Sequence, residues 1–150
     1  MKILFDTNVL FDIWAYSQDF EHSFAALDVA LLRGFQPAIA VTMAPDFVYL
    51  IEARTQRSWR EARALFGNIL DLFTILDVTG ADCRRAYEST MRDLEDAFIA
   101  FSAQRNNVDF IVTRNKRDFV ASPVPALTPC EFIALYKPEN IEYGTDELAQ

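Results

Sequence analysis

Acidic side chains follow two of the short apolar segments of this chain. Asp6 comes directly after residues 2–5, and Asp46 comes a few positions after residues 38–41. In an open sheet of parallel strands, ligands bind outside the carboxyl ends of the strands, so acids at these positions would face a common site. Both acids also have a simpler interpretation, as groups that cap or stabilise the first turn of the following helix.

Three further acids, Asp93, Glu95 and Asp96, open a segment with helical character. With Asp93 as the N-cap, Asp96 takes the third helical position, and helix capping alone would explain it. An apolar run starts immediately after Asp96, so its carboxylate should lie towards the core, whereas Asp93 and Glu95 can point to water. A carboxylate that points inwards needs a partner, and a cation would serve.

Polar side chains also follow the apolar segment at residues 109–112. Thr113 and Asn115 come directly after it, and Asp118 follows in the same loop. Oxygen ligands gathered without His or Cys suit a hard cation such as Mg²⁺ or Mn²⁺, which usually shares its coordination shell with a phosphate. Such an ion can activate water and neutralise charge that develops on a phosphodiester, and a second ion about 4 Å away could stabilise the leaving oxygen.

The elements that must position these groups alternate between strand and helix, which predicts an α/β fold. We expect a three-layer α/β/α sandwich around a mainly parallel central sheet of about five strands. Residues 2–5 should form the central strand, because the segments at 38–41 and 109–112 should flank it. The predicted strands are residues 2–5, 38–41, 73–76, 109–112 and 123–127.

The composition fits one compact domain, because 150 residues, 51% of them hydrophobic, can bury a substantial core. Residues 1–136 are predicted to form this domain, and residues 137–150 a loose C-terminal tail. No uncharged apolar stretch is long enough to span a membrane, and Cys83 and Cys130 have no metal-ligand or redox spacing. We therefore expect a soluble, cytoplasmic protein that does not bind membranes.

The net charge of −8 argues mildly against a non-specific nucleic-acid coat, unless the carboxylates hold cations and basic residues gather elsewhere. Arginines recur at every third position between residues 54 and 63, which on helices makes a basic strip. A solvated face balanced by Glu52 and Glu61 explains this strip, and contact with RNA phosphates or an acidic partner is the functional alternative. The candidate contact residues are Arg54, Arg57, Arg60, Arg63, Arg114 and Lys116.

Residues 5–10 (FDTNVL), 95–100 (EDAFIA) and 112–119 (VTRNKRDF) resemble, in this order, the three signature segments of the PIN domain. The resemblance covers nearly the whole chain and includes residues 127–132 (LTPCEF). PIN domains are metal-dependent ribonucleases, and small bacterial or archaeal ones are commonly the VapC-type toxins of toxin–antitoxin pairs. The resemblance therefore implies an endoribonuclease that forms a homodimer and whose active cleft is blocked by a cognate antitoxin.

The resemblance also implies roles for individual residues. Asp6, Asp46 and Asp96 would carry Mg²⁺ or Mn²⁺, with Asn115 at the fourth position. The supporting residues would be Asn8 and Thr113.

Two of these positions depart from the PIN pattern. The second acidic position is usually Glu and is here Asp46, and the fourth is often Asp and is here the neutral Asn115. The loss of one negative charge at Asn115 should weaken the binding of a second metal ion more than that of the first. Asp118 is the candidate to replace this charge. The alternative function is a catalytically weakened PIN-like module that binds RNA or protein. An aspartyl-nucleophile phosphatase is disfavoured, since it needs a second Asp at the position of Asn8.

Overall fold

The computed structural model describes residues 1–143, whose five strands pair in parallel into one sheet. The strands are β1 (Lys2–Phe5), β2 (Gln36–Ala40), β3 (Thr74–Leu76), β4 (Phe110–Val112) and β5 (Ala126–Leu127). Their order across the sheet is β3-β2-β1-β4-β5, which confirms the predicted central place of residues 2–5.

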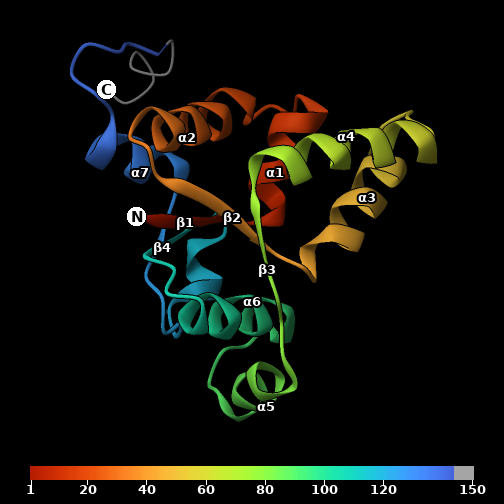
Figure 1. Ribbon diagram of the computed structural model, residues 1–150, viewed down its shortest axis with the longest axis vertical. Helices are drawn as coiled ribbons and strands as arrows, with labels where there is room; N and C mark the ends of the chain where they lie inside the picture. The colour runs from red at the N-terminus through yellow and green to blue at the C-terminus, as the bar shows by residue number, and fades with distance from the viewer. Residues whose placement is uncertain (144–150) are drawn as a thin grey trace.

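Helices cover both faces of the sheet, which confirms the predicted three-layer sandwich (Figure 1). The helices are α1 (Thr7–Ala15), α2 (Phe20–Leu32), α3 (Met43–Arg54), α4 (Trp59–Leu72), α5 (Gly80–Glu88), α6 (Leu94–Arg105), the 3₁₀ helix η1 (Lys116–Phe119) and α7 (Pro129–Tyr136). In Figure 1, α2 packs with α7 above the sheet and α5 packs with α6 below it. Within residues 1–143, no helix is long and apolar enough to cross a membrane.

β1 is buried on both faces, as a strand between two helical layers requires. Ile3, Leu4 and Phe5 have no solvent-exposed surface. The Phe5 ring packs edge-on against Phe73 and Phe132, with centroids 5.8 and 6.5 Å away. Burial of each large apolar side chain contributes roughly 1.5–3 kcal/mol, so the end of β1 is held rigidly in the core.

Side-chain caps set where the helices begin. A capping box begins α4, because Ser58 N donates to Glu61 Oε2 at 2.7 Å and Ser58 Oγ accepts from Glu61 N. Asp93 caps α6 as predicted: its Oδ1 accepts from the amides of Glu95 and Asp96 at 2.8 and 3.2 Å. Asp93 thus performs the capping that could otherwise have explained Asp96.

The described part of the predicted tail, residues 137–143, is attached to α2. The Tyr143 hydroxyl donates to Asp28 Oδ2 at 2.6 Å, and Nη2 of Arg33, the C-cap of α2, donates to the Lys137 carbonyl at 3.3 Å. The remainder of that prediction, residues 144–150, lies outside the described residues.

Candidate active site

Asp6 lies where β1 ends and α1 begins, at the carboxyl edge of the sheet. The residue is 5% exposed, and its carboxylate accepts from Thr7 N, Asn8 Nδ2 and Thr113 Oγ1 at 2.7, 2.6 and 2.7 Å. β4 pairs with β1, so the end of β4 brings Thr113 beside Asp6. The bond from Thr7 N caps α1, as the simpler interpretation required. A cap needs only that bond, and the other two donors hold the carboxylate in one orientation.

Asn8 connects the end of β1 to the loop after β4. Its Nδ2 also lies 3.3 Å from Thr113 Oγ1, and its Oδ1 accepts from Arg114 N at 3.1 Å. Thr113 Oγ1 accepts in turn from Asn115 N at 3.0 Å. The two residues predicted to support the site therefore belong to one hydrogen-bond network with Asp6.

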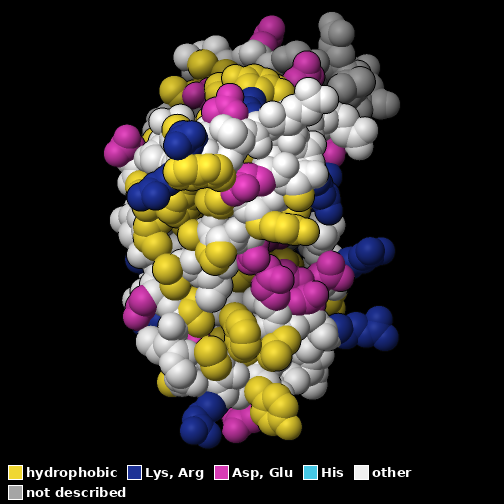
Figure 2. Space-filling view, turned by 90° about the vertical axis from the view of Figure 1, so that its right-hand side faces the viewer, with side chains coloured by type: hydrophobic (Ala, Val, Ile, Leu, Met, Phe, Trp, Pro, Cys, Tyr) yellow, Lys and Arg dark blue, Asp and Glu magenta, His cyan; other side chains and the backbone are white. Residues whose placement is uncertain are grey.

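Asp6, Asp46 and Asp96 line one cavity of about 440 Å³, although they come from three separate elements. Asp46 lies in the first turn of α3, and Asp96 lies in the first turn of α6. Figure 2 shows acidic side chains gathered beside a hollow in the middle of this face. The other predicted residues that line the cavity are the polar residues Asn8, Asn115 and Asp118 and the basic residues Arg54 and Arg114.

Glu95 lines the same cavity, although the sequence assigned it to solvent. Its carboxyl forms a hydrogen bond with Asp46 across the space between α6 and α3. Side chains in the first turn of a helix lean towards its N-terminus, so neighbouring acids there can both reach a crevice at that end. This lean, combined with the position of Asp96, was the signal that could have identified Glu95.

Burial raises the pKa of Asp96 to about 7, and neighbouring carboxylates add to the rise. The pKa of Glu95 is also raised to about 7, by burial and then by the hydrogen bond and charge of Asp46. Burial raises the pKa of Asp6 above its usual value as well, against the lowering effect of its hydrogen bonds. The cavity therefore concentrates negative charge that a cation would relieve. The carboxylates that raise the pKa of Asp96 belong to Asp6, Asp93, Asp118 and Glu95.

The donors in this cavity fit a hard divalent cation by type, because they are carboxylate and amide oxygens. Within the described residues, no three His, Cys, Asp or Glu side chains converge closely enough to form a ready-made metal site. Repulsion between the carboxylates opposes such convergence, as the raised pKa values of Glu95 and Asp96 indicate. The donor set thus fits the cation, whose charge would offset this repulsion.

The sequence matches a family model, described as the PIN domain, over residues 2–117. This chain belongs to the PIN domain family. The matched range spans β1 to β4 and extends from before Asp6 to beyond Asn115. No curated protein matches the sequence.

Several solved structures share the fold of this PIN domain. VapBC2 from Rickettsia felis, bound to a DNA fragment from its promoter, has a TM-score of 0.66 at 16% identity over 85% of this chain and 98% of that chain. FitAcB from Neisseria gonorrhoeae has a TM-score of 0.67 at 21% identity, covering 85% and 98%. A toxin–antitoxin complex from Klebsiella pneumoniae has a TM-score of 0.59 at 24% identity, covering 85% and 97%.

The predicted basic strip of this PIN domain is only partly free to bind RNA. Arg57 Nη1 donates to the Trp14 carbonyl at 2.9 Å, so this side chain already holds α1 against the α3–α4 connection. Arg60 lies over an adjacent tryptophan ring, 4.7 Å from its centroid, and Arg54 lines the acidic cavity. Arg63 is exposed. RNA contact by Arg54, Arg57, Arg60 and Arg63 stays a prediction.

The two basic residues after β4 also have partners within the domain. Arg114 Nε lies 2.9 Å from Asp12 Oδ2, and Arg114 Nη1 lies 2.7 Å from Asp19 Oδ2. Lys116 Nζ donates to Glu131 Oε1 at 2.7 Å. Their partners neutralise much of their charge, so these residues are weaker candidates for phosphate contact than the sequence indicated.

The raised carboxyl pKa values should make the metal-free protein lose stability as pH rises. Between the ordinary values, 3.8 for Asp96 and 4.5 for Glu95, and about 7, the folded state holds protons that the unfolded state has released. The free energy of unfolding should therefore fall through this window and level off above it. Melting temperatures in EDTA at a series of pH values measure this fall.

Two asparagine variants separate this effect from the rest of the titration. Asp96→Asn should make the decline shallower, whereas Asp71→Asn, on an exposed position of α4, should leave it unchanged. A melting temperature in EDTA that rises between pH about 5 and about 7 would contradict the raised pKa values.

Proposed function

We propose that this protein is a metal-dependent endoribonuclease that hydrolyses RNA phosphodiester bonds. The observation that carries the proposal is the meeting of Asp6, Asp46 and Asp96 on one cavity of a PIN domain. We propose that these three residues hold Mg²⁺ or Mn²⁺ and that Glu95, through its hydrogen bond with Asp46, is a fourth acid of the site. Residues 1–136 act as the nuclease domain.

Each residue of the site has a distinct task. When bound, the cation would activate water for in-line attack on phosphorus and neutralise charge on the phosphodiester. Asn8 and Thr113 orient the Asp6 carboxylate, as outer hydrogen-bond partners commonly orient metal ligands. Asn115 contributes an amide without charge, and Asp118 supplies the negative charge that is missing from that position.

We further propose that the protein is the toxin of a type II toxin–antitoxin pair. Structures with this fold include toxin–antitoxin complexes, which supports a cognate antitoxin as the partner of this chain. The proposal includes a homodimer and a cytoplasmic location, where an RNA substrate is available. In this role, an antitoxin segment would cover the acidic cavity and inhibit cleavage.

Incubation of the pure protein with a pool of RNAs tests the nuclease function directly. Cleavage is expected in Mn²⁺ and should stop when EDTA removes the cation, because the acids alone supply no positive charge. Intact RNA across several sequences and structures in Mn²⁺ would count against the proposal. RNA binding that persists in EDTA without any cleavage would instead favour the catalytically weakened binding module.

A further inference from the structure

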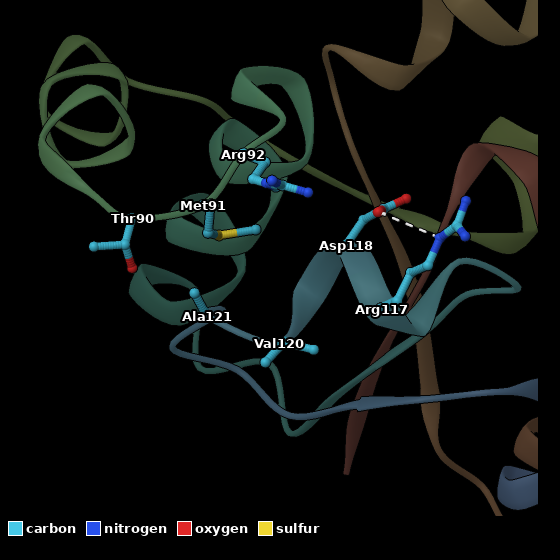
Figure 3. Close-up of a pocket in the computed structure, with 7 residues that line it drawn as sticks. All are labelled: Thr90, Met91, Arg92, Arg117, Asp118, Val120 and Ala121. Carbon is cyan, nitrogen blue, oxygen red and sulfur yellow. Dashed lines mark ion pairs between the residues drawn. The ribbon is translucent and has the colours of Figure 1, made fainter.

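A second cavity, of about 590 Å³, lies between the loop that precedes α6 and the segment around η1 (Figure 3). We call it the arginine pocket. Asp118 lines both this pocket and the acidic cavity, so the two spaces adjoin. The residues that line the arginine pocket are Thr90, Met91, Arg92, Arg117, Asp118, Val120 and Ala121.

The two arginines of this pocket keep most of their charge available. Arg117 Nε lies 3.8 Å from Asp118 Oδ1, and the Arg117 side chain is 89% exposed, so this ion pair is weak. Arg92 is exposed and forms no ion pair within residues 1–143. Arg114, by contrast, lies within 3 Å of two carboxylates. Exposed guanidinium groups bind phosphate strongly because they can donate two parallel hydrogen bonds.

The other part of the pocket is apolar. Val120 is 84% exposed, and Met91 and Ala121 lie beside it in the lining (Figure 3). Exposed apolar surface beside a positive charge suits a nucleotide, since the flat face of a base is apolar and its phosphate is anionic. The flexible Met91 side chain can adapt to different bases.

We propose that the arginine pocket binds a nucleotide of single-stranded RNA next to the phosphate held at the acidic cavity. Arg92 and Arg117 contact the RNA phosphates, and Met91 and Val120 pack against the base. The inference rests on the proposed ribonuclease function and adds a substrate subsite to it. A chain of net charge −8 with an acidic cavity needs cationic contacts beside that cavity to hold RNA. Base faces are accessible only in an unpaired strand.

Binding of a fluorescent single-stranded oligouridylate, measured by anisotropy in an Asp96→Asn background that does not cleave it, tests the pocket. The double variant Arg92→Ala/Arg117→Ala should bind roughly tenfold more weakly. The slope of log affinity against log salt should fall by about 0.7–1.4, for one or two lost phosphate contacts on a single strand. Unchanged melting temperatures confirm that the variants fold.

Three variants control for general charge and for the base contact. Arg84→Ala, at an exposed position of α5 outside both cavities, should leave affinity and salt slope unchanged. Arg92→Lys/Arg117→Lys should restore the salt slope, because the charge remains. Val120→Ser should weaken binding several-fold without changing the slope, because it removes only apolar contact.

The outcomes separate the pocket from the nuclease function. If the native protein cleaves RNA in Mn²⁺ and the double alanine variant shows the same KM, affinity and salt slope, the pocket proposal is overturned and the nuclease stands. If the native protein does not cleave but the double variant loses RNA affinity, the nuclease fails and the pocket stands. If the double alanine variant loses affinity for an acidic peptide but still binds RNA, the pocket is a protein-docking site and the proposal is overturned.

Discussion

Asp96→Asn should abolish RNA cleavage and the Mn²⁺-induced rise in melting temperature, while the metal-free protein stays at least as stable as the native form. Asp93 already caps α6, and within the described residues no hydrogen bond is donated to the Asp96 carboxylate. Burial and repulsion from neighbouring carboxylates therefore make the charge of Asp96 unfavourable without a cation, and they raise its pKa to about 7. Asp96→Asn removes this charge, so it relieves the repulsion from the neighbouring carboxylates. It also removes a proposed ligand of the cation.

The expected changes are large enough to measure separately. Mn²⁺ at about 100 times its Kd should stabilise the native protein by about 2.7 kcal/mol, or roughly 5–10 °C, because it binds only the folded state. Cleavage by Asp96→Asn should fall by more than about 100-fold, since even outer partners of metal ligands contribute about 10–100-fold. Asp71→Asn should preserve both properties. If Asp96→Asn keeps the metal response and the activity, Asp96 is not part of the site.

Arg114→Met should lower the free energy of unfolding by about 3 kcal/mol, because it leaves the buried Asp12 carboxylate without its cation. Asp12 is 0% exposed and lies 2.9 Å from Arg114 Nε. The hydroxyls of Ser17 and Ser23, at 2.6 and 2.8 Å, would remain as its side-chain partners and are neutral. Equilibrium urea unfolding measures the loss.

A double-mutant cycle shows whether the loss comes from this pair. Asp12→Asn removes the buried charge, so Arg114→Met should cost less in that background than alone. The salt slope of RNA binding should be unchanged in Arg114→Met, because its guanidinium is already engaged by Asp12 and Asp19. Native-like stability combined with a flatter salt slope would instead return Arg114 to the RNA-contact residues.

Local patterns in the sequence were enough to predict most of the fold. The apolar run that ends at Phe5 predicted a buried strand, and its place between the runs near Ala38 and Ile111 follows from alternation of strands with helices. The capping signal at Asp93 predicted a helix start because a cap is satisfied by residues within one turn. The meeting of Asp6 and Asp46 on one cavity follows from the same logic, since parallel strands end at one edge. Asp96 follows no strand and reaches this cavity from the first turn of α6.

The tertiary structure alone decided which charged side chains are available to ligands. Arg114 pairs with Asp19, 95 residues earlier in the chain, so no local pattern shows that its charge is neutralised. Glu95 faces Asp46 because α6 begins opposite the start of α3. Arg92 shares a cavity with Arg117 because the loop before α6 lies beside η1. These contacts depend on side-chain directions and on packing between distant segments, which spacing along a sequence does not encode.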